Sequence, residues 1–329
     1  MISSSPSKSR KWKRIAYPIL KLVFGLVIVA YLFHVIPLKQ MVEVVRGIDL
    51  FWLVFSILLN LASVFVWAIR LKTLLTGKLP FTLNQILVSY FFGLFVGSIL
   101  PSSLGGDLGQ FYHLQRKSTD KGFLASAIIV NRVTGVLALM VFVVVAGVWR
   151  YPAVLHVYWW IWTIVIIGMA FLYVVVTHRG IAEKFGLGFL PNKIRSPLVK
   201  VYEAFYYFGH HKRALFWAIL LGIVYQGMNI LVVALLGFAL HVRVAWTVWM
   251  VTVPLVSLIV LLPISIAGLG IQDASYVGLL STFAGIATPQ ALAISILIHL
   301  SRLIFAAIGA MIYAWDMIHR PRNISPSKS

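Results

Sequence analysis

The chain has 329 residues, of which 61% are apolar and only 11% charged, and its mean hydropathy is +0.96. This composition excludes an ordinary soluble globular domain and predicts an all-α polytopic membrane protein. A net charge of +20 would suggest nucleic-acid binding in a soluble protein. Here the basic residues lie in short loops and tails, where the positive-inside rule and anionic lipid head groups explain them, so no nucleic-acid partner is expected.

Six segments are apolar over the roughly 20 residues that a membrane-crossing helix needs. They cover residues 15–36, 51–71, 122–149, 157–177, 214–240 and 290–314. Basic residues precede the first segment, which is too long for a signal peptide and lacks a cleavage site, so we expect it to be retained. We therefore expect a single transmembrane domain over residues 15–315, with basic cytoplasmic tails at residues 1–14 and 316–329.

Two further apolar segments, residues 82–100 and 247–262, each run into a turn rich in Pro and Gly. If both cross the membrane, the basic residues divide into 13 inside and 12 outside, which is no bias. If both form re-entrant hairpins, 21 lie inside and 4 outside, and the positive-inside rule favours this arrangement. The hairpins then enter from opposite faces, which predicts an inverted repeat with a substrate site where they meet.

A turn, an acid and a buried arginine follow each of these two segments in the same order. Arg132 lies 11 residues into its segment, about 16 Å deep, and Arg302 lies at a similar depth in the last one. An arginine at the bilayer centre costs at least about 2.5–3.5 kcal/mol, so we expect Asp107 and Asp273 to pair with the two arginines. Guanidinium groups also suit phosphate, although two internal salt bridges that only fix helix packing remain an alternative.

The backbone N–H groups and hydroxyls of the two turns suit an anion, and the alternative reading is a cluster of glycines that packs helices. Asn131 and His299 flank the arginines. The candidate substrate-binding residues are Ser102, Ser103, Gly105, Gly106, Asp107, Asn131 and Arg132 in the first half, and Ser265, Gly268, Gly270, Asp273, His299 and Arg302 in the second.

No catalytic or cofactor motif is present, and the chain has no cysteine, so we expect no resident cofactor or metal. His210 and His211, with Glu203 as a nearby carboxylate, are interpreted as a surface pair. The segment 178–213 is basic, and its part 193–213 interleaves basic with apolar residues. This pattern predicts an amphipathic helix on the cytoplasmic surface.

Several of these residues together resemble the lysylphosphatidylglycerol synthase transmembrane-domain (flippase-like) family. They are Phe91-Phe92-Gly93, the run from Leu100 to Asp107, Ala125, Asn131-Arg132 and Gly135, then the run from Pro263 to Gly270, and Arg302. The resemblance covers about residues 15–315. It implies a membrane domain of the kind that, in the two-domain members, is associated with moving an aminoacylated lipid between leaflets.

The chain differs from the family pattern in three ways. We expect no soluble aminoacylating domain and therefore no aminoacyl transfer. Gly109-Gln110 stand where the first motif usually has an arginine, and Asp273 is the nearest acid where the second usually has a glutamate.

The leading hypothesis is an integral lipid translocator of the cell (inner) membrane, with both termini cytoplasmic. Its partners would be membrane lipids, anionic or phosphate-bearing, such as a phospholipid or a polyprenyl phosphate. One alternative is a membrane-embedded glycosyl or lipid transferase with Asp107 as general base. Another is an accessory subunit that recruits a partner synthase through residues 179–213.

Overall fold

The computed structural model describes residues 46–99, 104–149, 163, 206–208, 210–261 and 268–319, and in these ranges it is helical without any strand. The predicted span 15–36, nearly all of the span 157–177 and most of the surface segment 178–213 lie outside the described residues. So do the turn residues Ser102, Ser103 and Ser265.

Four of the described helices are long and apolar enough to cross a membrane. They are α3 (Leu50–Leu75), α6 (Lys121–Trp149), α11 (Lys212–Ala239) and α14 (Thr288–His319). The shortest of them, α3, has 26 residues and is therefore about 39 Å long, against a hydrocarbon core of about 30 Å. These helices confirm the four predicted spans that fall on described residues.

The two Pro- and Gly-rich segments form helical hairpins. In the first, α4 (Leu83–Ile99) packs along α5 (Gly105–Leu114), and in the second, α12 (Trp246–Leu261) packs along α13 (Ile271–Ala284). The 10 residues of α5 extend only about 15 Å, half the thickness of a hydrocarbon core. Lys78, before the first hairpin, lies 4.9 Å from the ring of Phe123, after it. The chain therefore returns to the end it left, as the re-entrant arrangement requires.

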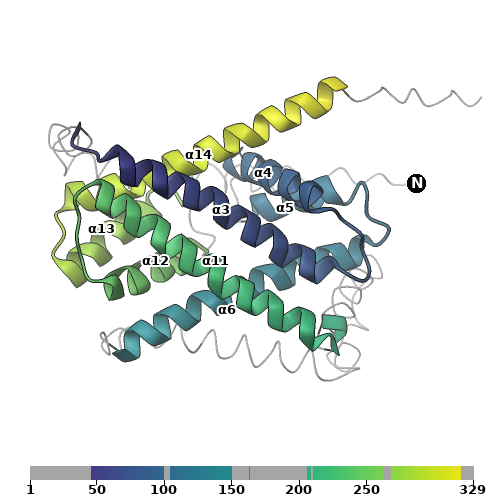
Figure 1. The fold of residues 1–329 in the computed structure, drawn as a ribbon, viewed down its shortest axis with the longest axis horizontal. Helices are drawn as coiled ribbons and strands as arrows, with labels where there is room; N and C mark the ends of the chain where they lie inside the picture. The colour runs from purple at the N-terminus through teal and green to yellow at the C-terminus, as the bar shows by residue number, and fades with distance from the viewer. Residues whose placement is uncertain are drawn as a thin grey trace, which may run out of the picture.

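The two hairpins enter from opposite ends of the long helices (Figure 1). The first packs in an apolar cluster with the last turns of α3 and the first turns of α6, including Leu74 and Phe123. The second packs in a cluster with the last turns of α6 and α11, including Val143 and Leu236. The inverted arrangement expected from the charge pattern is therefore present in the described part of the chain.

The described helices also repeat in order, since each half contains a long helix, two short helices and another long helix. The leading helices of the two halves, α3 and α11, run antiparallel. The backbone amide of Asp49 donates to the carbonyl of Ala239 at 2.9 Å, and Ser56 Oγ donates to the carbonyl of Val232 at 3.2 Å. In each half the last long helix packs on the first short helix of the other half, α14 on α4 and α6 on α12. This reciprocal packing places the inner helix ends of both hairpins, at Gly106 and Gly268 and here called their tips, in the middle of the molecule.

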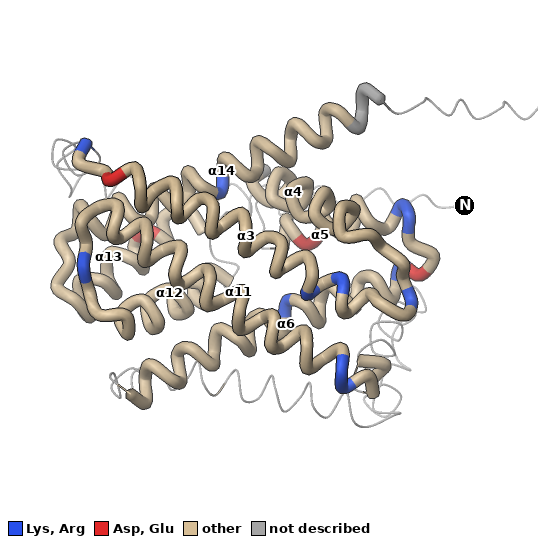
Figure 2. The backbone as a smooth tube through the Cα atoms, in the orientation of Figure 1, with Lys and Arg blue, Asp and Glu red and all other residues tan. Residues whose placement is uncertain are grey.

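Basic residues gather at the end where the first hairpin enters (Figure 2). The described loops and helix ends there carry Lys72, Lys78, Arg116, Lys117, Lys121, Lys212 and Arg213, whereas the other end carries Arg46 and Arg243. The positive-inside rule predicts that the basic end is cytoplasmic.

Single cysteines introduced into this cysteine-free chain test that orientation. Lys78→Cys and Ser118→Cys flank the first hairpin and should both react with a membrane-impermeant maleimide only from the cytoplasmic side. Arg243→Cys should react from the opposite side. Reaction of Lys78→Cys and Ser118→Cys from different sides would mean that the first hairpin crosses the membrane.

Glycines allow the helices around the hairpins to approach closely. A Cβ on Gly93 would lie 2.6 Å from the carbonyl oxygen of Gly106, and one on Gly309 would overlap the carbonyl oxygen of Phe91. Glycines therefore pack the two arms of the first hairpin together and pack α14 on α4.

Gly309→Ala should destabilise the protein by about 1–3 kcal/mol because the added methyl group forces α14 away from α4. The matched control is Gly278→Ala on α13, where a Cβ would have nothing within 4 Å, and it should be neutral or slightly stabilising. Unfolding in detergent, followed by tryptophan fluorescence, measures both. Equal stability of the two variants would contradict the close packing of α14 on α4.

Candidate functional site

Arg132 of α6 forms an ion pair with Asp107 in the first turn of α5. The expected partner of the first arginine is thereby confirmed. The two side chains are 28% and 34% exposed, so the pair is not fully buried. Asp107 also lies at a helix N-terminus, where a negative charge is favourable.

The second arginine contacts the residue before the expected acid. Arg302 Nη2 donates to Gln272 Oε1 at 3.2 Å. Asp273 accepts hydrogen bonds from Ser295 Oγ at 2.6 Å and from the backbone amide of Gly270 at 2.9 Å, and its Oδ1 lies 3.1 Å from His299 Nε2. The sequence interpretation missed Gln272, although its offset was informative: Gln272 follows Gly270 by two positions, as Asp107 follows Gly105.

The glycine turns differ in what they offer a ligand. In the second turn, the backbone amide of Gly270 is already used by Asp273, so it is not a free donor for an anion. Gly106 of the first turn packs against Gly93. Gly106 and Gly268 nevertheless line the same interior cavity, so the two tips face each other across it.

This space between the tips, here called the tip cavity, has a volume of about 400 Å³. Its lining takes in both hairpins and the side chains of Arg132, His299 and Arg302. No acidic residue is among the described residues that line it. Leu269 and Leu303 also line it, and they are 37% and 57% exposed, so the cavity reaches the apolar perimeter of the described helices.

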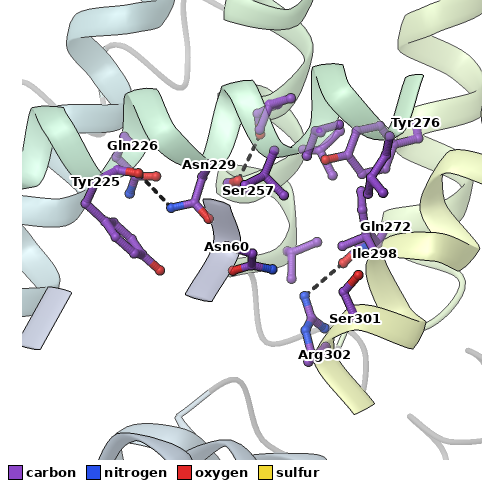
Figure 3. A pocket seen from close by; sticks show the side chains of 16 residues that line it. Asn60, Tyr225, Gln226, Asn229, Ser257, Gln272, Tyr276, Ile298, Ser301 and Arg302 are labelled. Carbon is purple, nitrogen blue, oxygen red and sulfur yellow. Dashed lines mark hydrogen bonds between the residues drawn. The ribbon is translucent and has the colours of Figure 1, made fainter. Parts of the chain in front are cut away.

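A second cavity of about 310 Å³ adjoins the first (Figure 3). Its polar lining consists of amides, hydroxyls and one cation, so it is called the amide cavity here. The polar residues are Asn60, Tyr225, Gln226, Asn229, Ser257, Gln272, Tyr276, Ser301 and Arg302. Ser257, Val260 and Arg302 line both cavities, which places Arg302 where the two meet.

Asn131 does not face either cavity. It is 4% exposed and is bound by Arg70 of α3, whose Nε donates to Asn131 Oδ1 at 2.6 Å and whose Nη2 donates to the carbonyl of Asn131. Arg70 is itself 2% exposed, and its Nη1 has no partner among the described residues. Asn131 therefore holds a buried cation at the contact of α3 with α6, next to Arg132 in sequence.

Comparison with known proteins identifies the family of the chain. Residues 19–310 match the family described as the lysylphosphatidylglycerol synthase TM region. The chain belongs to this family. A curated relative, the UPF0104 membrane protein PH1989 of Pyrococcus horikoshii, is 22% identical over 175 residues. That match covers 52% of each chain, so the alignment spans about half the length of the relative. No solved structure matches the chain.

Family membership and the four long apolar helices together make this a multi-pass membrane protein of a lipid-related family. The match includes both hairpins, both arginines and both cavities, since all of them lie within residues 19–310.

Asn131→Leu should destabilise the protein by about 2–3 kcal/mol, because it removes the side-chain acceptor of the buried Arg70 guanidinium and leaves it only the backbone carbonyl of residue 131. Asn229→Leu is a matched control, since within the described helices Asn229 donates only to the carbonyl of Tyr225 in its own helix, at 2.8 Å. It should cost less than about 1 kcal/mol. Chemical unfolding in detergent measures the difference.

The double variant Arg70→Met with Asn131→Leu should lose less stability than the sum of its single variants, because it removes both members of the buried pair. Additive losses in this double-mutant cycle would contradict the coupling of the two residues.

Proposed function

We propose that the protein is a lipid translocator that binds the phosphate of an anionic lipid in the tip cavity, between Arg132 and Arg302. The observation that carries the proposal is that two hairpins from opposite ends place their tips and two arginines around one cavity. Folds built from inverted repeats with broken helices bind their substrates at such a midpoint and expose them to either side by rocking of one half against the other.

The charge of the cavity supports an anionic ligand. Two guanidinium groups and one imidazole line it, and no carboxylate of the described residues does. Arg132 forms an ion pair with Asp107, and Arg302 donates a hydrogen bond to Gln272, a neutral amide. A phosphate at Arg302 would receive bidentate, charge-assisted hydrogen bonds in a setting of low dielectric constant.

The apolar part of the lining supports a lipid rather than a soluble anion. Leu94, Leu261 and Leu303 line the tip cavity along with the arginines. Through the exposed side chain of Leu303, the cavity continues onto a face of α14 that also exposes Leu300 and Ile304. Acyl chains would remain in the bilayer along this face while the phosphate reaches the arginines.

The transferase alternative finds less support. Asp107, its proposed general base, is in an ion pair with Arg132 and does not line the cavity between the tips. Nothing among the described residues supplies another carboxylate to the two cavities.

Translocation is tested with the protein reconstituted into vesicles that contain fluorescent phosphatidylglycerol, whose exchange between leaflets is followed by chemical quenching of the outer leaflet. Arg132→Gln and Arg302→Gln should each lower the exchange rate about tenfold or more, because each removes a charge-assisted hydrogen bond worth about 1.5–3 kcal/mol. The matched control is Arg243→Gln, at the end of the molecule remote from the tip cavity, which should exchange lipid at the wild-type rate.

An exchange rate that is unchanged in both cavity variants would refute the proposed site. Wild-type protein that chemically converts the lipid, as seen by mass spectrometry of the extracted vesicles, would instead favour the transferase.

A further inference from the structure

We infer that the head group beyond the phosphate is an uncharged polyol, such as glycerol, inositol or a sugar, and that the amide cavity binds it. This inference rests on the proposed function, because it takes the phosphate to lie at Arg302. It adds the chemical class of the substrate, which neither the family match nor the tip cavity determines.

The amide cavity offers hydrogen-bond donors and acceptors side by side, as vicinal hydroxyls require. Asn229 donates one hydrogen bond to the carbonyl of Tyr225, at 2.8 Å, which leaves its oxygen and a second N–H (Figure 3). Gln226 donates one to the carbonyl of Gly135, at 3.3 Å, and keeps the same two groups. The amide nitrogen of Asn60 makes no hydrogen bond within the described part of the chain.

Hydroxyl groups complete the acceptor set. Ser257 and Ser301 donate to backbone carbonyls of their own helices, at 2.8 Å and 2.9 Å, so their oxygens face the cavity as acceptors. Tyr225 and Tyr276 add phenolic groups and ring faces. A buried site that presents this many polar groups needs a ligand with many hydroxyls, because each group left unmatched costs binding energy.

A cationic head group does not fit this cavity. An ammonium requires a carboxylate or several acceptors free of competing cations, and no acid lines the amide cavity in the described residues. The nearest candidate, Asp273, has a side chain only 5% exposed and accepts hydrogen bonds from Gly270 and Ser295 beside His299. Arg302 in the lining repels a second positive charge instead.

The position of Arg302 determines where each part of a bound lipid would lie. Because it lines both cavities, a phosphate bound there has the amide cavity on one side and the tip cavity on the other. The polyol then enters the amide cavity, while the acyl chains leave past Leu269 and Leu303 at the edge of the tip cavity. A volume of about 310 Å³ lies at the lower end of the range for ligand pockets and suits a single small head group.

The test compares lipids with identical acyl chains and different head groups, titrated onto the full-length protein in detergent and measured by native mass spectrometry. Phosphatidylglycerol and phosphatidylinositol should bind at least about tenfold more tightly than phosphatidic acid, which has the phosphate alone, and than lysyl-phosphatidylglycerol, which adds positive charge. Asn229→Leu and Gln226→Leu should reduce the preference for phosphatidylglycerol over phosphatidic acid to less than about threefold. Gln290→Leu, the same change outside both cavities, should leave it intact.

The outcomes separate the two proposals. Arg302→Gln should weaken phosphatidylglycerol and phosphatidic acid by the same factor, since both contact it through the phosphate. Equal wild-type affinity for these two lipids, or preference for the lysyl lipid, would overturn the polyol inference and leave the anionic-lipid site standing. Lipid binding that is indifferent to Arg302→Gln would overturn both. The tryptophan fluorescence of each variant confirms that it is folded.

Discussion

The structure depends on one constraint, which is that a helix broken inside a bilayer must face protein or a polar cavity at the break. Each helix end leaves up to four backbone groups without an intrahelical partner, and lipid cannot supply one. The arms of the first hairpin are too short to cross, so its tip stops part of the way through the molecule. The second hairpin stops in the same region from the other end, and the tip cavity lies between the two. The cavity is thus a consequence of the fold as well as the proposed site.

The two halves bind their buried arginines through different types of side chain. In each, a side chain two positions after a glycine binds the arginine of the following long helix, as Asp107 binds Arg132 and Gln272 binds Arg302. The second arginine is thus bound by an amide at the position where the first is bound by an acid. Asp273 next to it is engaged by Ser295 and His299. Arg302 also lines the amide cavity, which therefore lies beside the arginine of the second half.

Much of this arrangement follows from the sequence. Lysine and arginine positions distinguish re-entrant hairpins from membrane-crossing spans. The reason is that the difference in basic residues between the two sides of the membrane depends only on which loops lie on the same side. The depth of Arg132 required a partner, and the nearest acid in the preceding turn was Asp107. Gln272 was missed for a related reason: a search for ion pairs selects the acid at Asp273 and passes over an amide that accepts the same hydrogen bond.

The amide cavity could not be predicted in this way. Its polar residues come from α3, α11, α12, α13 and α14, and most are single amides or hydroxyls in helices that are apolar on every side. In such helices no hydrophobic face indicates which direction a polar residue points. Asn131 illustrates the difficulty. Its position beside Arg132 in the sequence suggested that it lines the substrate site. Successive side chains of an α-helix point about 100° apart, however, and Asn131 therefore points to α3.

Exposure separates the structural arginine from the two proposed to bind substrate. Arg70 is 2% exposed, is bound to Asn131 and lies so close to Gly135 and Gly222 that a Cβ on either would come within 3.4 Å of its guanidinium. Such a group has no room for a ligand and fixes α3 against α6 and α11. Arg132 and Arg302 carry the same charge but line a cavity, and their partners come from the hairpin tips. Under the proposed function, a movement of either tip would change the contacts of its arginine and so couple access to the cavity to the binding of an anion within it.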